Sequence, residues 1–457
     1  METKKYTLVL LSISLLVCFW LPPFVAADDA SPQGQETPAP EQVTPPPGQA
    51  ATPPPGQAKA AEESIVERAG GYIHPFLQLS EMYNDNVFAV KNGAQQDYAT
   101  TVSPGIWLAA PRMKQQLLDI ATSTVTPGAA TLTRFISPSA TTYQTYLLYR
   151  GDFQRYDKFT GLNTDSHKVD GVFDYNFPSG LSIDMRDEFM KNHTILGIGA
   201  SATQDTYNAN LVNPVLSYDT GNKILLRADY ANYIINYNSP TDKFKNRTDN
   251  EASAYVFYKV QPKTSLFTEF DFVDVRYEKN ILVNNQEYHA YLGFVHQVTA
   301  KSQISVKAGA DVKDFASSAL SNTTDFTLEA QVQYLLTPKS SISFTYGRKT
   351  NESDIDVAGY VLEDSVTASY GYKMNDKLSG GLSIWFANEQ YKGTPVTEDG
   401  ETKLRRDTYY RVGPSVEYRF REWLRASLGY SYTKRDSDFP SFGYGNNIVS
   451  LTLKGSL

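Results

Sequence analysis

From Gly70 to the end of the chain, apolar and polar residues alternate along short segments that are separated by turns. The alternation is clearest in four segments, 147–154, 304–311, 326–334 and 424–433. A period of two places apolar side chains on one face of a β-strand and polar side chains on the other. The chain is therefore expected to be all-β, with each strand half apolar and half polar.

The connections between these segments also repeat. Two-residue turn candidates recur about every 40 residues, a spacing that propeller blades share. They lie at Ser179-Gly180, Gly221-Asn222, Pro262-Lys263, Ala300-Lys301, Pro338-Lys339, Asp376-Lys377 and Arg421-Glu422. Each interval holds two long strands and one polar loop, such as 239–249, whereas a propeller blade needs four short strands. Short turns at one end and long loops at the other are typical of outer-membrane barrels.

The strand spans can be counted from this pattern. They begin at Tyr72, Thr100, Thr142, Ser166, Leu181, Thr206, Lys223, Asn250, Thr264, Glu287, Ser302, Asp325, Ser340, Leu362, Leu378, Arg406, Trp423 and Asn446. Residues 70–457 are thus expected to form a transmembrane antiparallel up-and-down β-barrel of about 18 strands, with both termini in the periplasm. Counts of 16 or 20 stay open, because the stretch 113–140 could hide a helix or another hairpin.

Composition agrees with a barrel in lipid. The mean hydropathy of -0.39 is too polar for a bundle of membrane helices. The 31 tyrosines suit membrane interfaces, because the ring is apolar and its hydroxyl is polar. The net charge of -8 leaves no basic surface of the kind that binds nucleic acid, so no nucleic-acid partner is expected.

The N-terminus has the features of a secretory signal peptide. Lys4 and Lys5 precede an apolar run, which closes on Ala26-Ala27. Residues 1–27 are therefore expected to be removed on export. The only cysteine, Cys18, lies in this segment, so the processed chain would have no thiol for a disulfide, a zinc knuckle or catalysis. A lipoprotein anchored at Cys18 is the alternative, but the preceding Val17 is bulkier than such a site needs.

Residues 28–69 are low in complexity. The run Thr-Pro-Pro-Pro-Gly-Gln-Ala occurs at 44–50 and again at 52–58. Proline fixes φ and provides no hydrogen-bond donor, so this segment is expected to be an extended periplasmic linker. It could be a plain spacer or a tether to a periplasmic or polysaccharide-export component.

The first predicted hairpin carries a family resemblance. Its residues are His74-Pro75-Phe76-Leu77, Tyr83-Asn84-Asp85-Asn86-Val87-Phe88 and Thr101-Val102-Ser103-Pro104-Gly105-Ile106. They resemble the start of the putative β-barrel porin 2 family of outer-membrane proteins, several of which occur with exopolysaccharide production and export systems. The resemblance runs from about Tyr72 to Leu457, although its specific motif covers only the first two strands. It implies an outer-membrane barrel, with exopolysaccharide among the candidate solutes.

The polar faces of the strands supply the candidate lumen-lining residues. These are Arg150, Asp152, Asp184, Arg186, Arg227, Asp229, Glu269, Lys307, Asp311, Arg411 and Arg425. Basic and acidic residues are in balance on these faces, which disfavours a strongly anionic polymer as the solute. Alternatively, the charges pair across neighbouring strands and stiffen the wall. Bulges near 212–214, 231–233 and 272–274 would reverse the assigned faces.

No catalytic, cofactor-binding or metal site is expected. The histidines are His74, His167, His193, His289 and His296. His289 and His296 are seven residues apart, so they lie on opposite faces of a strand. No serine has the surroundings of a nucleophile, which leaves a barrel enzyme as the least favoured class.

The sequence therefore predicts a porin-like channel in the cell outer membrane, for passive passage or export of polar solutes. The alternative is a plugged structural or adhesin-like barrel that acts through its outer loops. The expected partners are outer-membrane lipid and the barrel-assembly machinery.

Overall fold

A computed structural model of the chain describes residues 71–111, 142–196, 203–240, 242–299, 302–353, 358–398 and 400–456. The expected signal peptide and linker, and the whole of the stretch 113–140, lie outside these residues. The main sheet consists of β1 (Ile73–Asn84), β2 (Asp97–Ala110), β3 (Tyr143–Tyr156), β4 (Thr164–Asn176), β5 (Leu181–Leu196), β6 (Thr203–Asp219), β7 (Ile224–Tyr237), β8 (Arg247–Gln261), β9 (Thr264–Tyr277), β10 (Asn285–Thr299), β11 (Ser302–Phe315), β12 (Thr323–Thr337), β13 (Ser340–Asn351), β14 (Ala358–Lys373), β15 (Leu378–Gly393), β18 (Arg406–Arg421), β19 (Leu424–Ser437) and β20 (Tyr444–Ser456).

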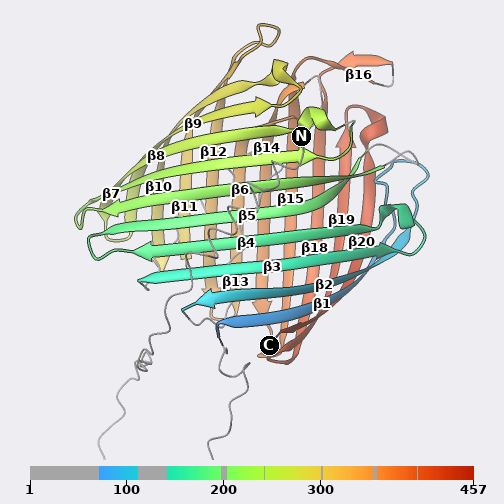
Figure 1. Ribbon diagram of the computed structural model, residues 1–457, viewed down its shortest axis with the longest axis horizontal. Helices are drawn as coiled ribbons and strands as arrows, with labels where there is room; N and C mark the ends of the chain where they lie inside the picture. The colour runs from blue at the N-terminus through green and yellow to red at the C-terminus, as the bar shows by residue number, and fades with distance from the viewer. Residues whose placement is uncertain are drawn as a thin grey trace, which may run out of the picture. The chain divides into compact units, whose positions relative to one another are not determined.

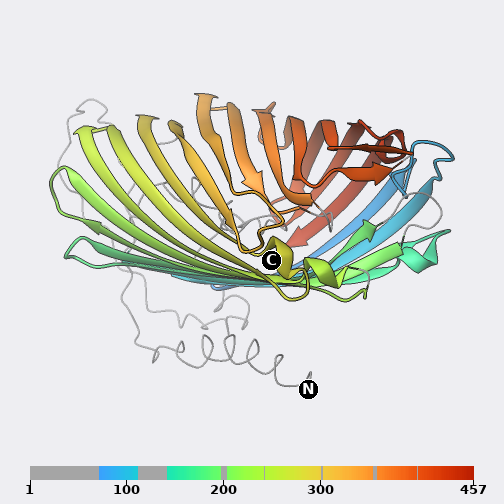
Figure 2. The ribbon, with the colours of Figure 1, turned by 90° about the horizontal axis from the view of Figure 1, so that it is seen from above.

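The sheet closes on itself. Each strand pairs antiparallel with the next, and β1 pairs with β20 from Phe76↔Ser456 to Asn84↔Ile448. The strands wrap around a common interior (Figures 1 and 2). Closure satisfies the backbone groups of the two edge strands, as a sheet in hydrocarbon requires. The predicted 18-stranded antiparallel barrel is confirmed.

The two ends of the barrel differ in their connections. At one end β8 and β9, and likewise β12 and β13, are joined by two residues. At the other end the connections are longer, and four contain 3-10 turns: η3 (Thr160–Leu162), η5 (Lys243–Lys245), η6 (Ile281–Val283) and η7 (Pro440–Phe442). The connection between β15 and β18 holds a separate hairpin of β16 (Val396–Glu398) and β17 (Glu401–Lys403). This asymmetry matches the pattern predicted from the turn candidates.

The predicted bulges are wrong. The register stays constant through 212–214, 231–233 and 272–274. Shifts occur instead near strand ends, beside short turns as at Lys259/Gln261 and Leu335/Thr337, and at the long-loop end at Ala358/Tyr360. The mid-strand prolines Pro104, Pro214 and Pro414 each lack ladder partners on one side, because proline has no N–H to donate. The pairing resumes in the same register, so inner and outer faces are not exchanged.

The outer face carries the apolar side chains. Leu292 is 69% exposed, Phe326 58% and Leu266 52%, and the tyrosines Tyr218, Tyr258, Tyr370, Tyr410 and Tyr418 share this face. Their neighbours along each strand are polar and face the interior, as in Asp229, Glu269 and Asp311. Such a surface suits lipid outside and water inside. Among the described residues, no helix is long and apolar enough to cross a membrane.

Candidate functional site

The interior of the barrel holds all eleven predicted lumen residues. Each lies on the strand face opposite the exposed apolar side chains, as the alternation in β7 illustrates. Arg150 and Asp152 border an internal cavity of about 170 Å³ against β2–β5. Their part in selecting a solute stays a prediction.

Many of these charges pair along a single strand. Arg150 Nε lies 3.0 Å from Asp152 Oδ2, and Arg186 Nε lies 3.2 Å from Asp184 Oδ1. Arg227 forms the same kind of pair with Asp229. Residues two apart in a strand point to the same side, so a long arginine side chain can reach the next carboxylate. The predicted pairing of charges therefore runs along the strands as well as between them.

The inner face of β7–β12 is rich in carboxylates, so the expected charge balance does not hold there. One register row crosses all six strands as Asp229, Ser253, Asp271, His289, Asp311 and Asp325. The acidic residues of this wall are Asp229, Asp249, Glu251, Glu269, Asp271, Glu287, Asp311, Asp325 and Glu329. The basic ones are Arg227, Arg247, Lys259, Lys307 and Lys313. We call this surface the acidic wall.

Two buried lysines hold the acidic wall together. Lys307 Nζ lies 2.7 Å from Glu269 Oε1 and 3.6 Å from Glu329 Oε2. Lys313 Nζ lies 2.6 Å from both Glu287 Oε1 and Glu352 Oε1. Because a buried charge is costly without a partner, each ammonium is matched to two carboxylates. Much of this wall is therefore buried and internally paired.

Glu352 reaches the acidic wall from a distant connection. It follows β13, yet its carboxylate accepts hydrogen bonds from the Tyr277 hydroxyl at 2.6 Å and the Asn285 amide at 3.2 Å, besides the Lys313 contact. These partners belong to β9, β10 and β11. The chain just beyond β13 thus packs on the long-loop end of that wall. Sequence alternation could not identify Glu352, because it lies outside the strands.

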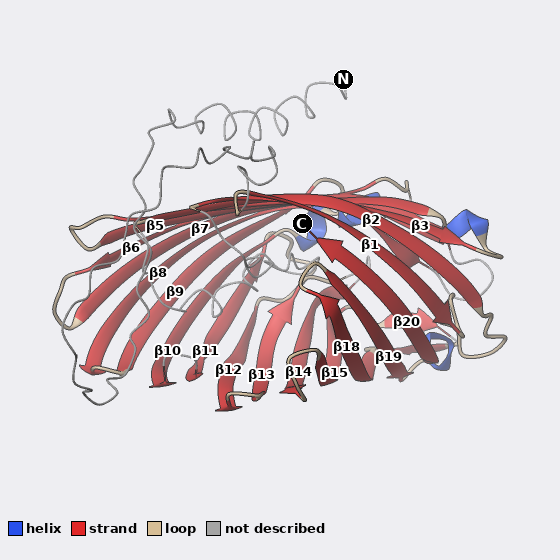
Figure 3. Ribbon diagram, turned by 90° about the horizontal axis from the view of Figure 1, so that it is seen from below, coloured by secondary structure: helices blue, strands red, loops and turns tan. Residues whose placement is uncertain are grey.

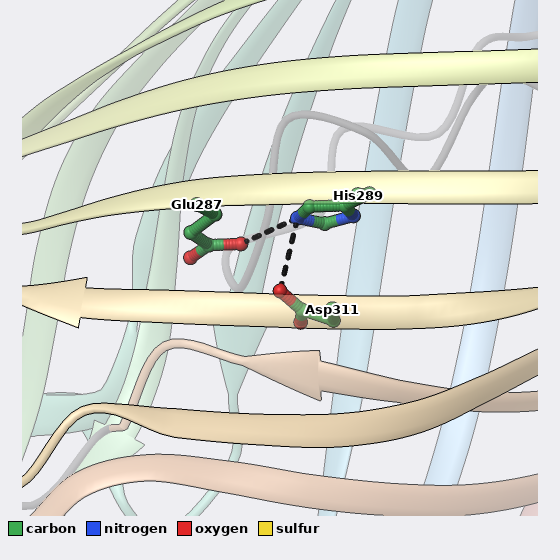
Figure 4. A group of neighbouring side chains, drawn as sticks. All are labelled: Glu287, His289 and Asp311. Carbon is green, nitrogen blue, oxygen red and sulfur yellow. Dashed lines mark hydrogen bonds and ion pairs between the residues drawn. The ribbon is translucent and has the colours of Figure 1, made fainter.

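Glu287, His289 and Asp311 form a compact cluster on β10 and β11 (Figure 4). His289 Nε2 lies 3.0 Å from Glu287 Oε2 and 3.4 Å from Asp311 Oδ1. The three side chains point toward one another in Figure 4. The spacing between histidines was the only feature compared in the sequence, so this group was missed. His289 is joined there by a carboxylate of its own strand and by one of the neighbouring strand β11.

The inner face of β13–β15 and β18 is different, because small polar residues dominate it. Ser343, Ser369, Ser383 and Gly413 form one register row. Gly371, Gly381 and Ser415 form another. An internal cavity of about 510 Å³ lies against these residues. We call this surface the serine–glycine wall. Its residues are small and leave open space in front of the strands, whereas longer charged side chains occupy the corresponding space on the acidic wall.

Basic residues gather next to the serine–glycine wall. The inner faces of β18–β20 carry Arg411, Arg419, Arg425, Arg435 and Lys454, against two carboxylates, Asp407 and Glu417. Arg411 and Arg425 are exposed, whereas most charges of the acidic wall are buried. Around the ring, β18–β20 are separated from β7–β12 by β13–β15 on one side and by β1–β6 on the other (Figure 3). The interior thus has an acidic and a basic side.

Comparison with solved structures finds outer-membrane proteins of Pseudomonas aeruginosa. The protein opdK is 11% identical, with a TM-score of 0.39, and the match covers 84% of this chain and 98% of that one. OccK2 (OpdF) is 10% identical, with a TM-score of 0.42 over 85% of this chain and 99% of that one. A bacterial polysaccharide outer-membrane secretin is 9% identical, with a TM-score of 0.33 over 84% and 98%. At these scores the likeness adds no argument about function.

The sequence comparisons address the family directly. No curated protein matches the chain. The family model described as putative β-barrel porin 2 matches residues 220–456, more than half of the chain. The hairpin motif at His74–Ile106, on which the resemblance was based, lies outside the matched residues. The protein is an outer-membrane β-barrel, and the chain belongs to the putative β-barrel porin 2 family.

Proposed function

We propose that the barrel is a passive channel for polar solutes, and that the path runs along the serine–glycine wall. The observation that carries this proposal is the contrast between the two walls. Most charges on β7–β12 are buried, and Lys307 and Lys313 each pair with carboxylates there, whereas the cavity of about 510 Å³ lies against serine hydroxyls and glycine backbone. Hydroxyl groups along such a path can exchange hydrogen bonds with a hydrated or hydroxyl-rich solute.

The accessible charge beside this path is mainly basic. Arg411 donates to Thr433 at 3.2 Å, and Arg425 lies 3.7 Å from Glu417, a long separation for an ion pair. Both guanidinium groups are therefore available to a passing solute. We infer that the channel favours uncharged and anionic polar solutes over cations, and that export of exopolysaccharide is one such use.

The proposal can be tested in proteoliposomes that contain the purified chain. We expect swelling in neutral sugars, at a rate that falls as the sugar becomes larger. We also expect a reversal potential that indicates anion preference in a KCl gradient. R411Q together with R425Q should shift this potential toward cations. R276Q is the matched control, because Arg276 lies on the outer face and pairs with Asp274 at 2.6 Å. Vesicles that do not swell would contradict the proposal.

The second candidate is a structural or adhesin-like barrel that acts through its outer loops. It is favoured by the packing of the connections at the long-loop end. Lys403 Nζ lies 4.9 Å from the ring centre of the buried Phe439, and the Arg405 guanidinium lies 3.9 Å from that of Phe442. A barrel that is plugged by ordered loops would bind a surface partner without conducting ions.

The remaining elements of the proposal concern partners and orientation. We infer that the long connections face the cell exterior and that both termini are periplasmic, as in other outer-membrane barrels. The outer face contacts lipid, and the barrel-assembly machinery inserts the chain. The N-terminal linker is proposed to contact periplasmic or polysaccharide-export components. Neither an enzymatic activity nor a cofactor is part of this proposal.

A further inference from the structure

We propose that Glu287, His289 and Asp311 bind a divalent transition-metal ion of the Zn²⁺ class on the inner wall of the barrel. The three residues offer one imidazole nitrogen and two carboxylate oxygens, a ligand set that such ions accept. The proposal does not depend on which solute the channel passes.

The distances between the ligand atoms suit a metal centre. His289 Nε2 is 3.0 Å from Glu287 Oε2 and 3.4 Å from Asp311 Oδ1. Zinc binds nitrogen and oxygen at about 2.0–2.2 Å, so the ligand atoms of a tetrahedral site are roughly 3.3–3.6 Å apart. The His289–Asp311 separation lies in this range, the His289–Glu287 separation is slightly shorter, and all three ligand atoms lie within 4.8 Å of one another. Three protein ligands with a water molecule in the fourth position would complete the site.

Every ligand is held in place through an atom that faces away from the centre. His289 Nδ1 lies 3.2 Å from the Tyr291 hydroxyl, which leaves Nε2 for the ion. Glu287 uses its other oxygen, Oε1, to bind Lys313 at 2.6 Å. Asp311 uses Oδ2 to accept a hydrogen bond from the Thr350 hydroxyl. Supporting contacts of this kind orient the ligands of known metal sites.

The surroundings leave negative charge that a cation would neutralise. Asp311 Oδ1 is buried, and its ion-pair contact with His289 Nε2 is long, at 3.4 Å. Asp271 pairs in register with His289, is only 4% exposed, and has a buried oxygen without a hydrogen-bond donor. Buried carboxylate oxygens that lack a full hydrogen bond are unfavourable, so a dication next to them would be stabilising. Lys313 opposes this effect, but its charge is shared between Glu287 and Glu352.

An ion could reach the site from the lumen. The side chain of His289 is 17% exposed, while those of Glu287 and Asp311 are 6% and 1% exposed. In the metal-free protein, a proton on Nε2 can bond to Glu287 Oε2 and lies near Asp311 Oδ1. The ion would displace that proton to solvent, and the two carboxylate contacts would become metal–oxygen bonds.

The test is a Zn²⁺ titration of the full chain in detergent, by calorimetry. We expect one tight site per barrel, and at least tenfold weaker binding in H289Q and in D311N. H296Q is the matched control, because His296 lies on the same strand and contacts Thr264. It should bind Zn²⁺ as the unchanged protein does. Heat-modifiable gel migration shows whether each variant is folded.

Co²⁺ provides a second measurement that does not depend on affinity. A site with one imidazole and two carboxylates should give the intense visible absorption of four-coordinate Co²⁺, and H289Q should lose it. Equal Zn²⁺ affinity in H289Q and the unchanged protein would overturn the proposal. A weak, six-coordinate Co²⁺ spectrum in the unchanged protein would overturn it as well.

Discussion

At the scale of single residues, Glu352 connects parts of the barrel that are far apart along the chain. Its carboxylate contacts Lys313, Tyr277 and Asn285, and it is buried with them. These contacts fix the chain beyond β13 against β9–β11. A single side chain therefore links the segment that follows β13 to three strands of the acidic wall.

Replacing Glu352 tests this role. E352Q removes the charge and leaves Lys313 with Glu287 as its ion-pair partner. Because a hydrogen bond to a charged group contributes more than a neutral one, we expect the free energy of unfolding to fall by about 2 kcal/mol. Urea unfolding in lipid vesicles would measure it. E422Q is the control, since Glu422 is exposed in a short turn. Equal stability of both variants would contradict the account.

The residues missed by sequence reasoning show where alternation stops being informative. Arg247 and Asp249 lie in the stretch 239–249 that was assigned to a loop, but β8 already begins at Arg247. Both face inward and pair at 3.0 Å. Charged residues such as arginine and aspartate are common in loops, so the sequence favoured a loop here. The pairing of Arg247 and Asp249 with neighbouring strands shows that they belong to the inner face of β8. Glu352 depends on contacts between distant segments, which no local pattern encodes.

At the scale of elements, three aromatic rings of the inner face cover glycines on the paired strand. Phe76 lies on Gly105, Phe267 on Gly293 and Tyr291 on Gly309, each in a directly opposite pair. A glycine gives the ring room to lie flat against the neighbouring strand, a device that also allows strong curvature. We therefore expect these three glycines to lie where the wall of the barrel curves.

Gly309 is the most restricted of these glycines. A Cβ there would overlap the carbonyl oxygen of Ala290 and lie 2.8 Å from Tyr291 Cδ1. Since backbone cannot move aside easily, G309A should destabilise the barrel by about 1–3 kcal/mol. G347A is the control, because its Cβ would meet only Ser365 Oγ at 3.6 Å. The fraction that migrates as folded barrel during stepwise heating gives the result, and identical curves would count against this reading.

The strand positions themselves could be predicted well. The largest error in a strand start is at β14, where Leu362 was expected and Ala358 is observed. Residues 358–361 were missed because Tyr360 and Val361 are both buried, which interrupts the alternation. They pack at the long-loop end, where Gly359 lies close to Phe315 and Leu320. Period-two patterning fails where both faces of a strand meet protein.

At the scale of the whole molecule, closure is the decisive feature. The β1–β20 pair joins residues 372 positions apart, as in the hydrogen bond between Ser80 and Thr452. The pairing of β1 with β20 could be predicted, because a barrel with an even number of strands leaves no edge open. The register of this pair could not be predicted, because no local pattern relates the first strand to the last. The division into acidic and basic walls likewise depends on the completed ring.

Closure can be tested by cross-linking. Leu79 and Leu453 are opposite each other in the β1–β20 pair and face outward. Paired strands bring Cα atoms to about 4.5–5.5 Å, within reach of a disulfide. L79C with L453C should therefore oxidise to an intramolecular cross-link in a chain without Cys18. L79C with L428C should not, because Leu428 lies one strand farther away, opposite Leu451. Absence of the first cross-link would contradict the register.

The central claim is that this ring encloses an open path beside the serine–glycine wall. Single-channel recording in planar bilayers tests it most directly, with the purified barrel on one side of the membrane. The account predicts stable, stepwise conductance with a preference for anions, reduced in the R411Q/R425Q variant. No conductance from protein that is folded by heat-modifiable migration would contradict the account and favour the plugged barrel.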